Sequence, residues 1–195
     1  MSLAITPVIP AGSLSAAAQP SLPSADGELL LRPWAPGDET VLLAAYRDAL
    51  IGRWHMRRVD SPEEARKWIA TCGRQWREES GAQWAVTRAS GGEILGRMAL
   101  RWIDLAQGLA ECGYWILPAA RRQGVAHRAL ITLSGWALDE AGFHRLELAH
   151  SHLNEASCRV AVKAGFPLEG VRRSAHLHRD GWHDMHQHAR IQGDA

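Results

Sequence analysis

The chain has one stretch, residues 111–126, whose residue types and spacing point to chemistry. An apolar run begins beside Glu111 and ends at Pro118, and a turn containing Arg121, Arg122 and Gly124 follows. This order predicts a strand, a glycine-bearing turn and the first turn of a helix. The first N–H groups of a helix have no partner inside the helix, so they attract anions. With two arginines beside them, they predict a site for a phosphate or pyrophosphate.

Two His-x-His pairs near the end of the chain are a second candidate for chemistry. His176 pairs with His178, and His186 with His188. Strand alternation places each pair on one face, and four imidazoles could bind zinc. However, His178 borders a turn, no cysteine lies nearby in the sequence, and hairpin histidines are usually exposed. The sequence therefore favours surface histidines, and no metal is predicted.

Capping residues and periodicity predict the elements that position these residues. Ser61, Pro62 and Glu64 form a capping box before a helix with apolar residues at helical spacing. Asn154 is expected to cap a short helix. Further helices are expected from Asp38 to about Gly52 and from Gly124 onward, and strands over 28–33, 83–87, 93–102, 111–117, 145–150, 168–177 and 182–191.

Strand and helix signals alternate over residues 111–166, whereas antiparallel signals dominate before and after. This arrangement predicts an α/β (α+β) fold, with a mixed, mostly antiparallel central sheet and helices on both faces. The 195 residues, 46% of them hydrophobic, fit one domain, expected over 28–192. Residues 1–27 are rich in Ala, Ser and Pro, and they are predicted to form a flexible or loosely docked arm.

Charge and cysteine usage limit the partners and the compartment. A net charge of +1 gives no global field that would favour nucleic acid or an anionic membrane, so neither partner is expected. No apolar run approaches the roughly 18–20 residues of a membrane span. The three cysteines show no CxxC spacing, which favours a reduced, cytoplasmic setting.

The order of motifs resembles the GNAT superfamily of N-acetyltransferases. Its elements here are Arg121-x-x-Gly124-x-Ala126, then Asn154-x-x-Ser157, then Lys163-x-Gly165-Phe166. Leu31-Arg32-Pro33 and Glu169-Gly170 resemble the Rim-type branch, which includes enzymes that acetylate the N-termini of ribosomal proteins. The resemblance covers roughly residues 28–192. It implies the GNAT fold, acetyl-CoA as donor and an amine as acceptor.

The resemblance also assigns the donor site. It implies that the pyrophosphate lies on the backbone amides of residues 121–126 and that the pantetheine arm lies along the strand near Ile116. There a backbone N–H would polarise the thioester carbonyl. Asn154 would bind the pantetheine arm, or it serves as a plain helix cap. The expected donor-binding residues are Ile116, Leu117, Arg121, Arg122, Gln123, Gly124, Val125, Ala126, Asn154 and Ser157.

Catalytic residues follow from the same resemblance. Ser157 matches the serine that Rim-type enzymes place as the acid for the leaving thiolate. Other superfamily members use a tyrosine in this region, but neither Tyr46 nor Tyr114 lies on that helix. Glu111 is expected to be the general base, acting through water, unless it is an ordinary surface residue at a strand end. His150 and His152 are the alternative bases. Cys158 is not expected to form an acetyl-enzyme, because the sequence places no base beside it.

The acceptor is left open between a protein N-terminus and a small-molecule amine. Its pocket is expected to be lined by Trp34, Trp54, His55, Met56, Trp102 and Trp182. No strong acidic cluster is present there, which disfavours a highly cationic acceptor. Two alternatives remain: a module that binds acyl-CoA without transferring its acyl group, and a transferase of another acyl group such as succinyl. The protein is expected to be a monomer or a homodimer.

Overall fold

An eight-stranded sheet organises the chain, in a computed structural model that describes residues 5–56 and 58–194. Its strand order is β1-β2-β3-β4-β5-β6-β8-β7. All neighbours pair antiparallel except β5 and β6, which run parallel. The predicted mixed, mostly antiparallel sheet is therefore confirmed. The strands are β1 Leu22–Pro23, β2 Leu29–Pro33, β3 Ala82–Arg88, β4 Ile94–Asp104, β5 Leu109–Ile116, β6 Arg145–Ser151, β7 Leu168–His178 and β8 Gly181–Ile191.

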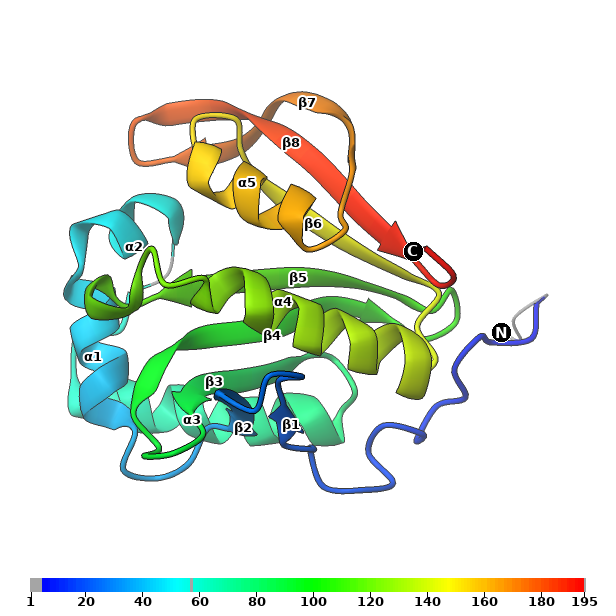
Figure 1. The fold of residues 1–195 in the computed structure, drawn as a ribbon, viewed down its shortest axis with the longest axis horizontal. Coiled ribbons are helices and arrows are strands. Elements are labelled where there is room, and N and C mark those ends of the chain that lie inside the picture. The colour runs from blue at the N-terminus through cyan, green and yellow to red at the C-terminus, as the bar shows by residue number, and fades with distance from the viewer. Residues whose placement is uncertain (1–4, 57, 195) are drawn as a thin grey trace.

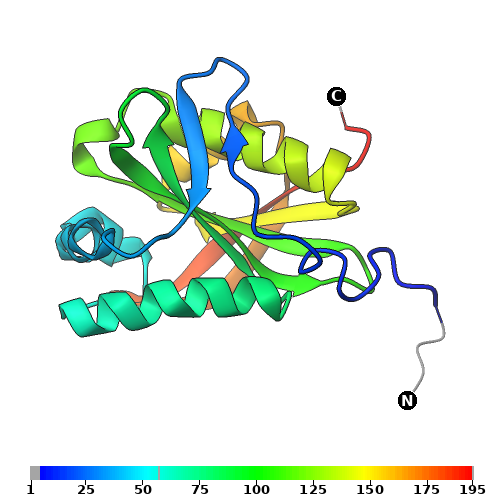
Figure 2. The ribbon, with the colours of Figure 1, turned by 90° about the horizontal axis from the view of Figure 1, so that it is seen from below.

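Helices cover both faces of the sheet, as predicted. Figure 1 shows α4 and α5 across the near face, and Figure 2 shows α3 on the opposite side from α4. The helices are α1 Glu39–Arg47, α2 Ala49–Trp54, α3 Pro62–Arg77, α4 Val125–Gly135 and α5 Glu155–Lys163, with a 3₁₀ turn η1 at Pro118–Ala120 and a π-helical turn η2 at Trp136–Glu140.

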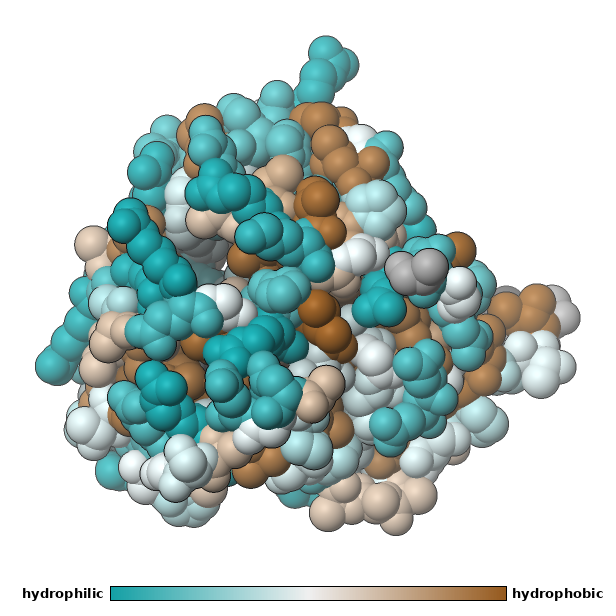
Figure 3. Space-filling model, viewed as in Figure 1, coloured by the Kyte–Doolittle hydropathy of each residue, from teal (hydrophilic) through white to brown (hydrophobic). Residues whose placement is uncertain are grey.

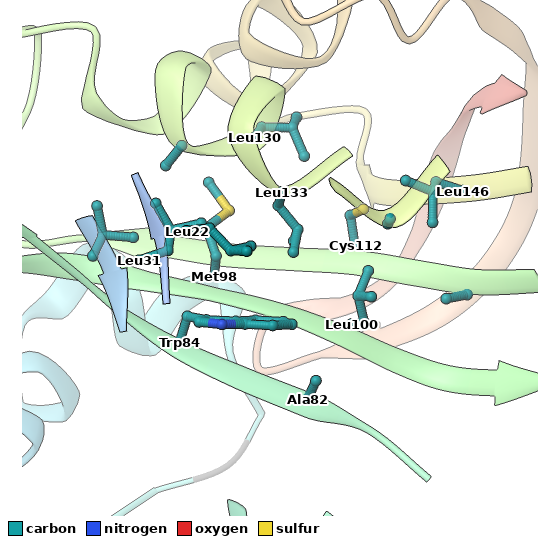
Figure 4. Packing of buried hydrophobic residues seen from close by; sticks show 14 of the residues in the cluster. Leu22, Leu31, Ala82, Trp84, Met98, Leu100, Cys112, Leu130, Leu133 and Leu146 are labelled. Carbon is teal, nitrogen blue, oxygen red and sulfur yellow. The ribbon is translucent and has the colours of Figure 1, made fainter. Parts of the chain in front are cut away.

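Strand alternation gives the molecule a core on each face of the sheet. Trp84 points to the core under α4, where Figure 4 shows it near Met98, Leu100 and Leu133. Its neighbour Ala85 points the other way, into the core under α1 and α3. Because successive strand residues face opposite sides, β3 can bury nearly all of its residues.

Two helix predictions differ in outcome. Ser61 caps α3 as expected: its hydroxyl accepts a hydrogen bond from the Glu64 N–H at 3.1 Å. The single helix expected from Asp38 to about Gly52 is instead two helices. The break lies at Asp48, whose extended backbone ends α1 and whose carboxylate accepts from the Ile51 N–H at 2.9 Å, capping α2.

Residues 5–27 of the predicted flexible or loosely docked arm are docked along the domain. Ile9, Leu14 and Leu22 are buried in the core under α4. Two tryptophan indoles hold the segment's backbone: Trp76 donates to the Ala17 carbonyl at 2.9 Å and Trp84 to the Pro20 carbonyl at 2.8 Å. Prolines at positions 7, 10, 20 and 23 interrupt the segment, so its apolar residues give no periodic signal, but each of these three fills a specific place.

The face drawn in Figure 3 carries mainly hydrophilic side chains, with apolar ones in scattered patches. Within residues 5–56 and 58–194, no helix is long and apolar enough to cross a bilayer.

Glu79 anchors the N-terminal segment and gives the first prediction. Its carboxylate accepts hydrogen bonds from the N–H groups of Gly12, Leu14 and Ser15. Partial burial raises the pKa of Glu79, but the hydrogen bonds from the backbone lower it by more. The pKa of Glu79 therefore lies below its ordinary value. We expect Glu79→Gln to lower the free energy of unfolding by about 1–2 kcal/mol at neutral pH, measured by denaturant unfolding.

The pH dependence follows from the lowered pKa. The stabilisation is present above the unfolded pKa of about 4.3 and is lost as pH falls through the lower folded value. The difference between wild type and Glu79→Gln should therefore vanish in acid. Glu78→Gln, the exposed neighbour, is the control and should change stability little. Equal effects of the two substitutions would contradict the anchoring role.

Candidate active site

The parallel strands β5 and β6 pair over only three residues and then separate. Their register runs from Leu109 opposite Arg145 to Glu111 opposite Glu147. Beyond that point β5 continues to Ile116 and β6 to Ser151, but the two strands no longer pair with each other. Figure 1 shows the two ribbons diverging. We call this opening the fork. Its β5 edge presents backbone groups that β6 does not use.

A cavity of about 1070 Å³ fills the fork and extends beyond it. Its walls come from the end of α2, from β4 and β5, from the start of α4, from the end of β6, and from α5 and β7. Segments far apart in the sequence thus converge on one space. The predicted site residues that line it are Trp54, His55, Met56, Trp102, Glu111, Ile116, Arg121, Arg122, Gly124, Val125, Ala126, Asn154 and Ser157.

The start of α4 has the backbone geometry that an anion site requires. Arg122 and Gly124 both have left-handed backbone, with φ of 63° and 73°. The helical hydrogen bonds of α4 begin with Arg128 N–H and the Gly124 carbonyl, at 3.1 Å, so the preceding N–H groups at the start of α4 have no helical acceptor. A Cβ added at Gly124 would have only Arg128 Nε within 4 Å, at 3.9 Å. The backbone is therefore open to close approach by an anion.

Arg121 is engaged with protein groups, which differs from the expected contact with a donor phosphate. Its guanidinium pairs with the Asp48 carboxylate and donates to the Ile116 carbonyl at 3.2 Å. Both contacts tie the turn before α4 to α2 and to the end of β5. Arg122 is exposed, and its guanidinium makes no hydrogen bond or ion pair with the described residues.

Ser157 and Tyr114 form a hydroxyl pair that the sequence did not predict. Their oxygens lie 2.7 Å apart, with Ser157 on the first turn of α5 and Tyr114 on β5. Asn154 caps α5, as expected, by accepting from the Ser157 N–H at 3.2 Å. Burial raises the pKa of Tyr114 above its ordinary value, so its phenol stays protonated at neutral pH. Tyr114 does not lie on α5, as the sequence indicates, but its hydroxyl reaches that helix from across the fork.

Glu111 lies at the vertex of the fork, as the last residue of β5 that pairs with β6. Its carboxylate forms an ion pair with Arg101 of β4, its direct partner in the register. It is the only acidic residue among the lining residues that the structure describes. The lining has seven arginines and lysines, namely Arg97, Arg101, Arg121, Arg122, Arg159, Lys163 and Arg172.

His55 is held neutral in this positive lining. Burial, followed by the charges of Arg97 and Arg101, lowers its pKa to about 3. Of the alternative bases, His150 is buried and lines the cavity, and burial lowers its pKa too. His152 is exposed, and it does not line the cavity.

Four predicted residues lie outside the cavity lining. Leu117 donates its N–H to the Leu95 carbonyl and packs against the core under α1 and α3. Trp34 is buried in that core, edge-on to Trp68. Gln123 is exposed and donates to the Ala119 carbonyl, and Trp182 is 63% exposed. By contrast, Trp102 is 74% exposed and does line the cavity, at a bulge in β4 where its φ is 51°.

A family model described as an acetyltransferase (GNAT) domain matches residues 28–167. The uncharacterized N-acetyltransferase YoaA of Bacillus subtilis is 27% identical over 154 residues, which span 78% of this chain and 86% of that protein. A ribosomal-protein-serine acetyltransferase of Escherichia coli is 29% identical over 99 residues, or 51% of this chain and 55% of that protein.

Solved structures share the fold. The ribosomal-protein α-N-acetyltransferase RimL, solved in complex with coenzyme A, superposes with a TM-score of 0.82 at 22% identity. The superposition covers 90% of this chain and 100% of that one.

The lowered pKa of His55 gives the second prediction. We expect its imidazole to stay neutral through pH 5 and to titrate near pH 3, as followed by NMR of labelled histidine. Between about pH 6.5 and 3 the unfolded chain binds a proton that the folded chain does not, so His55 lowers stability as pH falls. Arg101→Gln removes a nearby positive charge and should raise the pKa. Arg74→Gln, on the exposed side of α3, should leave it unchanged; a pKa near 6.5 in the wild type would contradict this account.

Proposed function

The chain belongs to the GNAT acetyltransferase family and is an N-acetyltransferase, and from that premise we propose that it transfers acetyl from acetyl-CoA to the α-amino group of a protein N-terminus. The observation that supports this most is the fork. Its open β5 edge, the free N–H groups of α4 and the Tyr114–Ser157 pair all face one cavity. A strand edge, an anion site and a proton donor are the three features that a thioester donor of this kind needs.

The residues present fit such a donor. The N–H groups at the start of α4 and the exposed Arg122 are suited to a diphosphate. The edge of β5 beyond Glu111, which β6 does not pair, offers backbone partners for an extended amide-bearing arm, apart from the Ile116 carbonyl that accepts from Arg121. Acetyl-CoA supplies the activated acetyl group as a thioester. Arg121, which is held by Asp48, has the role of fixing the turn rather than of binding phosphate.

The proton transfers are assigned to groups that line the cavity. Ser157, hydrogen-bonded to the protonated Tyr114, donates the proton that the leaving thiolate takes up. Glu111, the sole carboxylate in the described lining, receives the proton that the amine loses, through water. Arg101 holds the Glu111 carboxylate in place. Together these groups argue against a module that only binds acyl-CoA.

The acceptor side favours a peptide terminus. Trp102 and Met56 are exposed apolar side chains at the cavity, so they can contact residues that follow the reacting amine. The excess of basic groups in the lining disfavours a polycationic amine. One similar protein is named a ribosomal-protein-serine acetyltransferase, and RimL is named an α-N-protein acetyltransferase, a name that refers to a protein α-amino group. A small-molecule amine is the alternative acceptor.

The function is tested by thiol release from acetyl-CoA with a panel of short peptides and small amines, and with succinyl-CoA as a second donor. We expect turnover above hydrolysis with acetyl-CoA and peptides. Gly124→Glu should weaken CoA binding at least about tenfold, because it adds a carboxylate where the phosphates lie and strains a φ of 73° by about 1–2 kcal/mol.

Gly92→Glu is the matched control. Gly92 has a similar φ of 68° with open space around it, and it does not line the cavity. The Gly92→Glu substitution should reproduce the backbone strain of Gly124→Glu without changing CoA affinity. Tight CoA binding without turnover on any amine would overturn the transferase proposal, and equal CoA binding by wild type and Gly124→Glu would overturn the phosphate placement.

The hydroxyl pair gives a separate prediction. Ser157→Ala and Tyr114→Phe should each lower kcat by about 100-fold with a smaller change in CoA affinity, because each removes part of one proton donor. The double variant should be about as slow as the slower single variant. Tyr46→Phe changes the other tyrosine that lines the cavity and should retain kcat. Effects confined to KM would instead make Ser157 a binding residue.

A further inference from the structure

Four side chains with metal-binding atoms meet beside the fork, and none of them has a role in the proposed acetyl transfer. They are His150 of β6, Cys158 of α5, and His186 and His188 of β8. One ligand atom from each lies within 4.8 Å of all the others. His150 and His188 are buried, and His186 and Cys158 are half-buried.

Strand register brings the three histidines together. His150 pairs directly with His186 across β6 and β8, and alternation places His188 on the same face as His186. Helix α5 covers this face. Cys158, the residue after Ser157 on α5, brings its thiol close to the three histidines.

The tautomers of two of these histidines are fixed by the backbone. His150 Nδ1 lies 2.8 Å from the Ser151 carbonyl, and His188 Nδ1 lies 2.9 Å from the Phe166 carbonyl. A carbonyl only accepts, so both Nδ1 atoms donate. In neutral rings both Nε2 atoms then carry lone pairs, yet they face each other at 3.1 Å. Two facing lone pairs repel each other, so this pair needs either a shared proton or a metal ion between or beside the two nitrogens.

A third histidine has an unsatisfied nitrogen. His186 Nδ1 is buried without a hydrogen-bond partner in the described chain. Buried polar atoms in native structures nearly always have a partner, so this one points to a missing ligand.

We propose that His150, Cys158, His186 and His188 bind a zinc ion. Three imidazoles and one thiolate form a donor set typical of Zn²⁺. Zn–N bonds of about 2.0–2.1 Å in a tetrahedron place neighbouring nitrogens about 3.3 Å apart, close to the 3.1 Å between the two Nε2 atoms. The carbonyls on the two Nδ1 atoms are the second-shell acceptors that orient metal-bound histidines.

The four protein ligands close the site, which makes the metal structural rather than catalytic. It fastens α5 to β6 and β8. Because Cys158 directly follows Ser157, the metal fixes the helical turn that holds Ser157 against Tyr114. The sequence predicts surface histidines and no metal. The predicted exposure holds for His176 and is wrong for His178 and His188, which are 7% and 0% exposed.

The experiment uses the full chain after removal of metal with a chelator. Zn²⁺ is titrated against a competing chromophoric chelator, and Co²⁺ is added as a spectroscopic substitute. We expect one tight equivalent of Zn²⁺, visible Co²⁺ absorption typical of a tetrahedral site, and a thiolate-to-cobalt charge-transfer band. Zn²⁺ should also raise the thermal midpoint of unfolding.

Cys158→Ala should abolish the charge-transfer band and weaken Zn²⁺ binding more than about 100-fold, since loss of second-shell partners alone costs about 10–100-fold. His186→Gln should weaken binding similarly while retaining the thiolate band at high Co²⁺. His152→Gln, an exposed histidine two residues from His150, is the control and should bind as the wild type does. Circular dichroism checks that each variant is folded.

Three results would overturn the proposal. One is an absence of stoichiometric Zn²⁺ binding by the wild type, which would mean that a shared proton satisfies the two Nε2 atoms. Another is equal affinity in wild type, Cys158→Ala and His186→Gln. The third is an octahedral Co²⁺ spectrum without a thiolate band.

Discussion

The separation of β5 from β6 after Glu111 is the constraint on which the rest of the structure depends. A parallel pair that continued would use the backbone groups of β5 internally and leave no cavity. The fork stays open because other elements satisfy or cover its two edges. At the β5 edge, Arg121 donates a hydrogen bond to the Ile116 carbonyl. At the β6 edge, α5 covers β6 and β8. The hydroxyl contact between Tyr114 and Ser157 then bridges the gap at one point.

Local signals predicted much of the fold, because they depend on neighbours in the sequence. The Ser61 and Asn154 caps and the left-handed Gly124 are each fixed within one helical turn, and all three lie where the pattern placed them. The exception is Asp48. Apolar spacing continued through it, but its carboxylate has a distant partner, Arg121, and a new helix begins there.

Features made by distant residues were not predictable in the same way. Tyr114 and Ser157 lie 43 residues apart, and only the geometry of the fork brings their hydroxyls together. Alternation indicated that His186 and His188 share a face, but the register with β6 was needed to add His150. The N-terminal segment docks through scattered single contacts, which leave no periodic pattern to detect.

The distribution of charge connects the donor side with the acceptor side. The chain as a whole has a net charge of only +1, yet its cavity lining has seven arginines and lysines and one glutamate. Positive groups at such density favour an anionic donor. They also disfavour a second positive charge, so an amine that enters for the proposed transfer is shifted toward its neutral form. The neutral amine is the nucleophile that acyl transfer needs. The same lining would therefore bind the donor and promote deprotonation of the acceptor. Glu111 would then receive the proton of an amine whose pKa the surrounding positive charge has lowered.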